Sequence, residues 1–154
     1  MSSTTMTQPT LEIPNCFYRV SAKRLILDDS GRFLLTQEND GRRELPGGGL
    51  DHGELATTGL RREIMEETGL NVTRVADHPS YFLTALNQKK TRRIANIIFE
   101  TQLENCDFSA SDECVALDFF DVESAKSLEL FPNVTEFLKI FDPARHRDTP
   151  KTAR

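Results

Sequence analysis

Apolar and polar positions alternate near the start of the chain. Residues 17–27 carry this alternation and end in the apolar run Leu-Ile-Leu, a pattern typical of a β-strand. Residues 28–31, Asp-Asp-Ser-Gly, form a turn signal, and residues 32–37 have the composition of a second strand. We therefore expect these two strands to form a hairpin.

Further along the chain, the apolar spacing becomes helical. Leu60 and Ile64 lie four residues apart within residues 55–68, which predicts a helix, and Gly69 stands where a left-handed C-terminal cap belongs. The preceding Leu-Pro-Gly-Gly-Gly at residues 45–49 excludes a helix there and predicts a loop. The later pattern predicts three strands and a closing amphipathic helix, at residues 72–86, 92–103, 114–120 and 133–141.

The mixture of strands and helices, without regular alternation, indicates the α+β class and a sandwich around a mixed β-sheet. The length of 154 residues suits one domain, which we place at residues 15–142. Residues 1–14 are expected to be a flexible N-terminal arm, and residues 143–154 a flexible C-terminal tail. No apolar run is long enough to predict a membrane span.

Charge and cysteine content exclude several other classes. The net charge of -5 does not suit a protein that grips a nucleic-acid polymer through its phosphates, so no such partner is expected. An odd number of cysteines without metal-ligand spacing predicts neither a disulfide framework nor a zinc site, and it favours a reducing, cytoplasmic compartment. These cysteines are Cys16, Cys106 and Cys114.

Three glutamates share one face of the predicted main helix. Glu63, Glu66 and Glu67 fall within an arc of roughly 100°, where they repel one another and lie near the negative end of the helix dipole. A solvated acidic face is the ordinary interpretation, but the neighbouring glycine-rich loop and Arg62 favour a functional site. Clustered carboxylates are oxygen ligands suited to Mg²⁺ or Mn²⁺.

Together with its surroundings, this helix resembles the Nudix box. Gly48, five residues, Glu54, seven residues and then Arg-Glu-Ile-Met-Glu-Glu-Thr-Gly-Leu at 62–70 match the pattern G-x5-E-x7-R-E-U-x-E-E-x-G-U, in which U is a bulky aliphatic residue. Seven fixed and two aliphatic positions agree over these 23 residues. The resemblance extends to about residues 15–142 and implies the α/β/α sandwich of that family.

The resemblance also implies a role for each matching position. Glu54 and Arg62 are expected to form a structural salt bridge that locks the loop onto the helix, while Gly48 and Gly69 are structural. The implied metal ligands are the backbone carbonyl of Gly47 and the side chains of Glu63, Glu66 and Glu67, and these three glutamates are also the implied catalytic residues.

The activity that follows is divalent-metal-dependent hydrolysis of a nucleoside diphosphate linked to another moiety, such as a (d)NTP or a nucleotide sugar. The alternative is a catalytically silent Nudix-like module that binds or senses a nucleotide, but such a module would be expected to lose box glutamates, and all are kept. Homodimers are common in the family, so a homodimer is one expected assembly.

The box does not contain the general base, so a later carboxylate is needed. Glu113 is our first candidate because it precedes the short strand at 114–120, with Glu100 as the rival and Asp112 third; a solvated loop acid is the ordinary alternative for Glu113. Some members of the family carry a proline or a tyrosine after the box that indicates their substrate class, but residues 84–87 of this chain, Thr-Ala-Leu-Asn, contain neither. Candidate substrate contacts are Lys89, Lys90, Arg92 and Arg93, for which a solvated turn is the more common explanation, and Phe17, Tyr18, Tyr81 and Phe82, which as strand residues more often belong to the core.

Overall fold

The computed structural model describes residues 14–153. Its centre is a mixed sheet with strand order β4 (Gly47–Gly49), β1 (Tyr18–Leu25), β7 (Arg93–Leu103) and β5 (Val72–Val75), and β6 (Tyr81–Leu86) also pairs with β7. β1 and β7 run parallel, whereas the other pairs are antiparallel. The predicted mixed-sheet α+β class is therefore confirmed.

The predicted hairpin of the first two strands forms only next to its turn, and the strands themselves pair elsewhere. β2 (Phe33–Gln37) lies in a second sheet, between β3 (Arg43–Glu44) and β8 (Ala116–Phe120). Next to the turn, Leu27 bridges Phe33, and the backbone N–H groups of Leu34 and Asp28 donate to the Ile26 and Arg32 carbonyls. The turn does reverse the chain, but β1 has its two edges occupied by β4 and β7, so β2 pairs elsewhere.

The strand expected at residues 72–86 is interrupted. β5 and β6 are separated by residues 76–80, which include Pro79. Both strands pair with the same edge of the long strand β7, and the backbone N–H groups of Ala76 and Ser80 bond to the Glu100 and Ile98 carbonyls. A proline lacks the N–H that a continuous ladder needs, so the chain bulges away here and then returns.

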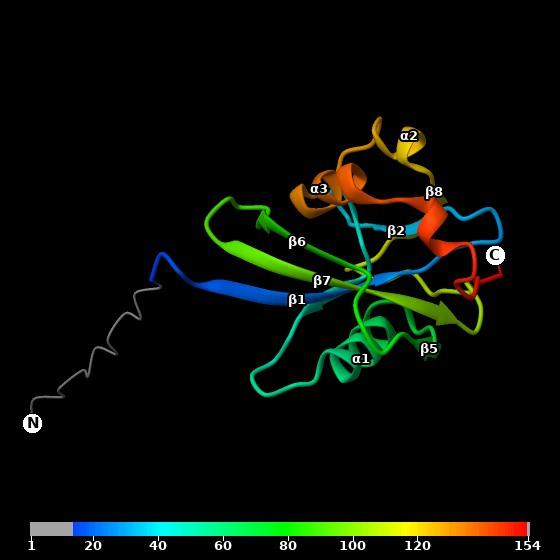
Figure 1. Ribbon diagram of the computed structural model, residues 1–154, viewed down its shortest axis with the longest axis horizontal. Coiled ribbons are helices and arrows are strands. Elements are labelled where there is room, and N and C mark those ends of the chain that lie inside the picture. Colours follow the sequence, from blue (N-terminus) through cyan, green and yellow to red (C-terminus); the bar gives the residue numbers. More distant parts are fainter. Residues whose placement is uncertain (1–13, 154) are drawn as a thin grey trace, which may run out of the picture.

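Helices cover the two faces of the central sheet (Figure 1). α1 (Ala56–Thr68) buries Leu60 and Ile64 and ends at Gly69, whose φ of 71° makes the predicted left-handed cap. α3 (Pro132–Ile140) lies across the sheet from α1, with the second sheet and the short α2 (Val122–Ala125) on the same side as α3. This layering is the expected sandwich, and its larger apolar core lies between the central sheet and α3.

The segment expected to be a flexible C-terminal tail is packed against the sheets. A 3-10 helix, η1 (Pro143–His146), buries His146, and Thr152 lies only 1% exposed. The Thr152 backbone N–H donates to the Leu27 carbonyl at 2.7 Å, and its hydroxyl accepts from the backbone N–H of Leu103 at 3.1 Å. A polar composition concealed this docking, because the contacts are hydrogen bonds and one buried histidine rather than an apolar stripe.

The proposed N-terminal arm, residues 1–14, lies outside the described residues except for Pro14. Among residues 14–153, no helix is long and apolar enough to cross a membrane.

Candidate active site

The glycine-rich segment, for which the sequence predicts a loop, instead forms the short strand β4, which pairs antiparallel with β1 so that Gly47 lies opposite Lys23. Gly47 has a φ of 140°, and a Cβ atom there would lie 2.2 Å from the Ala22 carbonyl oxygen. Only glycine can take this conformation at such close approach. The fixed backbone leaves the Gly47 carbonyl within 3.4 Å of the Lys23 ammonium, at the wall of a cavity.

Gly48 brings the glycine-rich segment against α1. A Cβ atom on Gly48 would lie 2.9–3.1 Å from the carboxylate atoms of Glu63. The missing side chain therefore makes room for a carboxylate from the helix beside the backbone of the loop, which places two kinds of oxygen donor side by side.

Arg62 ties the loop to the helix. Its guanidinium meets the Glu54 carboxylate through two bonds, Nε to Oε2 at 2.9 Å and Nη2 to Oε1 at 3.0 Å, so the predicted ion pair is present. The hydrogen bond from Arg62 holds the pKa of Glu54 below its usual value and, in return, Glu54 raises the pKa of Arg62. The same guanidinium also reaches Glu63 at 2.9 Å and Glu66 at 3.3 Å.

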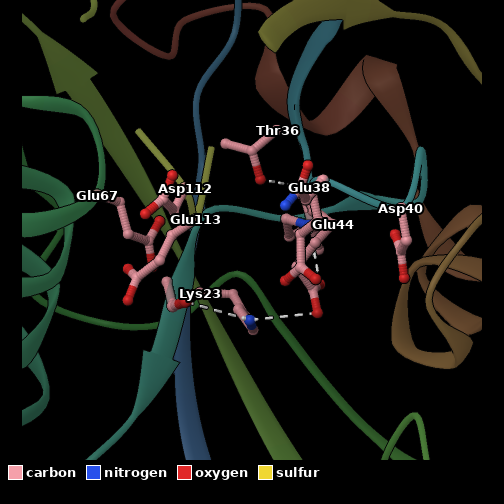
Figure 2. A pocket seen from close by; sticks show the side chains of 11 residues that line it. Lys23, Thr36, Glu38, Asp40, Glu44, Glu67, Asp112 and Glu113 are labelled. Atoms are coloured by element: carbon pink, nitrogen blue, oxygen red, sulfur yellow. Dashed lines mark hydrogen bonds and ion pairs between the residues drawn. The ribbon is translucent and has the colours of Figure 1, made fainter. Parts of the chain in front are cut away.

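Glu67 faces a cavity of about 450 Å³ beside the loop. Figure 2 shows its carboxylate next to Asp112 and Glu113, with Glu44 on the far side of the cavity and Lys23 between the two sides. Burial, with the charges of Glu63 and Glu113, raises the pKa of Glu67 to about 7 against the lowering effect of Arg24 and Lys23. A carboxylate with such a pKa in a cleft is characteristic of functional sites.

The segment that carries Glu113 is attached to the end of α1. The Ser111 hydroxyl donates to the Glu67 carbonyl at 3.1 Å and accepts from the backbone N–H of Cys114 at 3.2 Å. Two predicted base candidates, Glu113 and Asp112, consequently lie in the same cavity as Glu67.

The rival candidate, Glu100, occupies a different environment. Its carboxylate lies 2.6 Å from Nδ1 of His146, and it does not line the cavity of Glu67. Burial raises the pKa of Glu100, but the hydrogen bond from His146 and further donors outweigh burial and leave that pKa below its usual value. Glu100 therefore joins the docked C-terminal segment to β7.

The three helix glutamates do not converge. Glu66 is exposed and Glu63 is engaged with Arg62, whereas Glu67 lies in the cavity. In residues 14–153, no three His, Cys, Asp or Glu side chains are close enough together to hold a metal ion. The donor chemistry nevertheless suits a hard divalent cation, since the Glu63 and Glu67 carboxylates and the Gly47 carbonyl are all oxygen donors around one loop.

Two buried cations on β1 were not among the predicted site residues. Lys23 points into the cavity, while Arg24 points to the opposite face and donates to the Leu60 carbonyl under α1. Burial lowers the pKa of Arg24 to about 10 despite nearby Glu67 and Glu63. The signal was available, because two adjacent charges precede the apolar run at residues 25–27.

A polar chain extends from Lys23 toward a second cavity. Glu44 lies 3.5 Å from the Lys23 ammonium and accepts from Nδ2 of Asn133 at 2.7 Å, and that same Nδ2 lies 3.3 Å from Oδ1 of Asn96. This second cavity, of about 200 Å³, shares Lys23 and Glu44 with the first. The two cavities are therefore neighbours, and only the first one holds the helix carboxylate Glu67.

Comparison with known proteins assigns this arrangement to a family. A family model described as the NUDIX domain matches residues 17–141. The chain belongs to the Nudix family. A MutT-like protein of Streptomyces ambofaciens is 30% identical over 129 residues, which are 82% of this chain and 80% of that protein. The Nudix box recognised at residues 48–70 is thus confirmed by relatives that match far beyond it.

Solved structures agree with this assignment. The MutT protein of Methanosarcina mazei Go1 is 25% identical with a TM-score of 0.66, covering 90% of this chain and 100% of that one. The ORF135 protein of E. coli is 24% identical with a TM-score of 0.66, and the match covers 86% of this chain and 94% of that one. An ADP-ribose pyrophosphatase of Streptococcus suis is 23% identical with a TM-score of 0.61, and the match covers 90% of this chain and 98% of that one. The protein is a Nudix hydrolase, an enzyme of a class that cleaves pyrophosphate links.

Proposed function

We propose that this Nudix hydrolase is a divalent-metal-dependent pyrophosphohydrolase acting on a nucleoside diphosphate linked to another moiety. The observation that carries the proposal is the placement of Glu67: a half-buried carboxylate with a raised pKa faces a cavity that also contains the Gly47 carbonyl and Glu113. A site built of oxygen donors suits Mg²⁺ or Mn²⁺.

The residues proposed to hold the cation are Gly47, through its carbonyl, and Glu63, Glu66 and Glu67. Glu63 and Glu66 would have to release Arg62, which keeps Glu54 as its partner. A bound divalent cation supplies positive charge to the diphosphate oxygens and acidifies a nearby water. The Glu54–Arg62 pair holds the loop on α1 while this exchange takes place.

Glu113 is proposed as the general base. It lines the same cavity as Glu67 and comes from a segment attached to α1 through Ser111, so it can approach the phosphorus that is attacked. Its carboxylate would take the proton of the attacking water. Glu100 is a poor alternative because His146 already occupies its carboxylate.

The second cavity is proposed to receive part of the substrate beyond the diphosphate. It adjoins the first cavity at Lys23 and Glu44, and its lining includes the polar side chains of Asn96 and Asn133. This arrangement favours a substrate that extends from its phosphates into a pocket with polar partners, as a nucleotide does.

A substrate panel tests the proposed function. Release of phosphate, pyrophosphate or nucleoside monophosphate is measured for (d)NTPs, nucleotide sugars and dinucleotides with Mg²⁺, with Mn²⁺ and with a chelator. We expect at least one class to be cleaved with a kcat/KM of about 10⁴ M⁻¹s⁻¹ or more, and cleavage to stop with the chelator. Activity that persists in chelator, or no cleavage of any class with metal, would contradict the proposal.

A further inference from the structure

Lys23 is the one cationic side chain among the described residues that line the larger cavity. The same wall carries six carboxylates, from Glu38, Asp40, Glu44, Glu67, Asp112 and Glu113. An anionic substrate that enters this cavity meets strong negative charge, so a cation already built into the wall alters what can bind there.

The lysine ammonium is held at a defined point. Lys23 is 6% exposed, and its Nζ lies 3.4 Å from the Gly47 carbonyl and 3.5 Å from Oε2 of Glu44. The aliphatic stem covers Gly47, since a Cβ atom on that glycine would lie 3.0 Å from Lys23 Cδ. Figure 2 shows the ammonium between the Glu67 and Glu113 side of the cavity and the Glu44 side.

The contacts of Lys23 leave donor capacity unused. An ammonium group has three donors, and its two partners here lie farther away than the roughly 2.7–2.9 Å of a good charge-assisted hydrogen bond. Glu44 does not depend on Lys23 for its position, because its other oxygen accepts from the Leu45 backbone N–H at 2.9 Å and from Asn133 at 2.7 Å.

We propose that Lys23 is a substrate-binding residue that donates to a phosphate oxygen beside the Gly47 carbonyl, and that its ammonium opposes a divalent cation at that carbonyl until phosphate is bound. This inference deepens the proposed function and rests on it. Its signature is a pair of opposite effects: without the charge of Lys23, the protein binds metal more tightly and a diphosphate more weakly.

The rival explanation is that Lys23 only neutralises Glu44. In that case, loss of the lysine would weaken diphosphate binding through the bare charge of Glu44, and neutralising Glu44 would restore binding. Replacing both groups by neutral side chains of similar size therefore separates a lost donor from an uncompensated acid.

The test measures binding by isothermal titration calorimetry, with no turnover. Mn²⁺ is titrated alone, and methylenediphosphonate, a diphosphate analogue whose bridging carbon resists hydrolysis, is titrated at saturating Mn²⁺. The proteins are wild type, Lys23→Met, the double variant Lys23→Met with Glu44→Gln, and Lys139→Met as a matched control, since Lys139 lies exposed on α3. Lys23→Gln replaces Lys23→Met if the latter does not fold.

We expect Lys23→Met to bind Mn²⁺ about threefold more tightly or better and the diphosphonate about 10-fold to 100-fold more weakly. The double variant should remain about 10-fold weaker for the diphosphonate, and Lys139→Met should match wild type. Unchanged diphosphonate affinity in Lys23→Met, or recovery in the double variant, would overturn the role of Lys23 and leave the proposed function intact. Wild-type protein that binds no Mn²⁺ would overturn both.

Discussion

At the scale of single residues, the site is governed by where charge is buried. Glu67 and Lys23 line the same cavity, and Arg24 lies beneath the helix that carries Glu67. A buried carboxylate is costly to ionise unless a cation accompanies it. The free protein therefore holds a carboxylate with a raised pKa at the place where the proposed metal would bring positive charge.

The raised pKa of Glu67 makes the metal-free protein sensitive to pH. Between the usual pKa of 4.5 and the folded value of about 7, the folded state keeps a proton that the unfolded chain releases, so stability contributed by this group falls as pH rises. Glu67→Gln should remove this loss. In urea unfolding with a chelator, the variant's advantage over wild type should be larger at pH 8 than at pH 5; an equal difference at both would show that Glu67 ionises normally.

Kinetics of two carboxylates assign the general base. Glu113→Gln should lower kcat by about 100-fold or more with KM nearly unchanged, and it should shift or erase the acid limb of the pH–rate profile. Glu100→Gln should leave kcat close to wild type, because Glu100 is bonded to His146 and lies outside the cavity. The reverse pattern would transfer the role to Glu100.

At the scale of elements, the site depends on how the glycine-rich strand β4 meets α1. Close approach at Gly47 and Gly48 lets backbone and carboxylate oxygens share one wall, and the Glu54–Arg62 pair joins the loop to the helix. The loop and the helix therefore act as one unit, and removal of the ion pair should shift the position of β4.

A double-mutant cycle tests this unit. Arg62→Ala and Glu54→Ala should each destabilise the fold, and the double variant should cost less than the sum of the two, because either single change leaves the same pair broken. Unfolding free energies from urea titrations provide the measurement. Strict additivity would mean that the pair contributes no coupling. The exposed pair Lys139–Glu136 on α3 serves as a comparison, in which little coupling is expected.

Local sequence patterns predicted some elements better than others. α1 and its Gly69 cap follow from residues close together in the chain, and the contact of Arg62 with Glu54 follows from the box. The break at residues 76–80 coincides with Pro79, which is visible in the sequence, whereas the pairing of β2 with β8 depends on which strand edges are already occupied. The place of Lys23 in the site likewise depends on strand pairing, because β1 brings it opposite Gly47 of β4. No local sequence pattern predicts this pairing.

At the scale of the whole molecule, the C-terminal segment completes the sandwich. His146 links Glu100 on β7, at 2.6 Å, with the Tyr81 hydroxyl on β6, at 2.6 Å. Thr152 then bonds to Leu27, which follows β1, and to Leu103, the last residue of β7. Residues 143–153 therefore connect parts of the protein that are distant in sequence.

Removal of the buried histidine should weaken the whole fold. His146→Ala should lower the free energy of unfolding by about 2 kcal/mol or more, because Glu100 and Tyr81 each lose a hydrogen bond of 2.6 Å to its buried ring. His78→Ala, at an exposed position between β5 and β6, is the control and should change stability by less than about 0.5 kcal/mol. Equal, small effects from both variants would show that the C-terminal segment contributes little to the fold.

The central claim is that Glu67 and a divalent cation act together in pyrophosphate cleavage. The most direct measurement is kcat for the best substrate of the panel, with wild type and Glu67→Gln, across a Mg²⁺ titration. We predict that wild type is inactive in chelator and recovers with Mg²⁺, and that Glu67→Gln stays at least about 100-fold lower in kcat at saturating metal. Full activity of Glu67→Gln with Mg²⁺ would contradict the account.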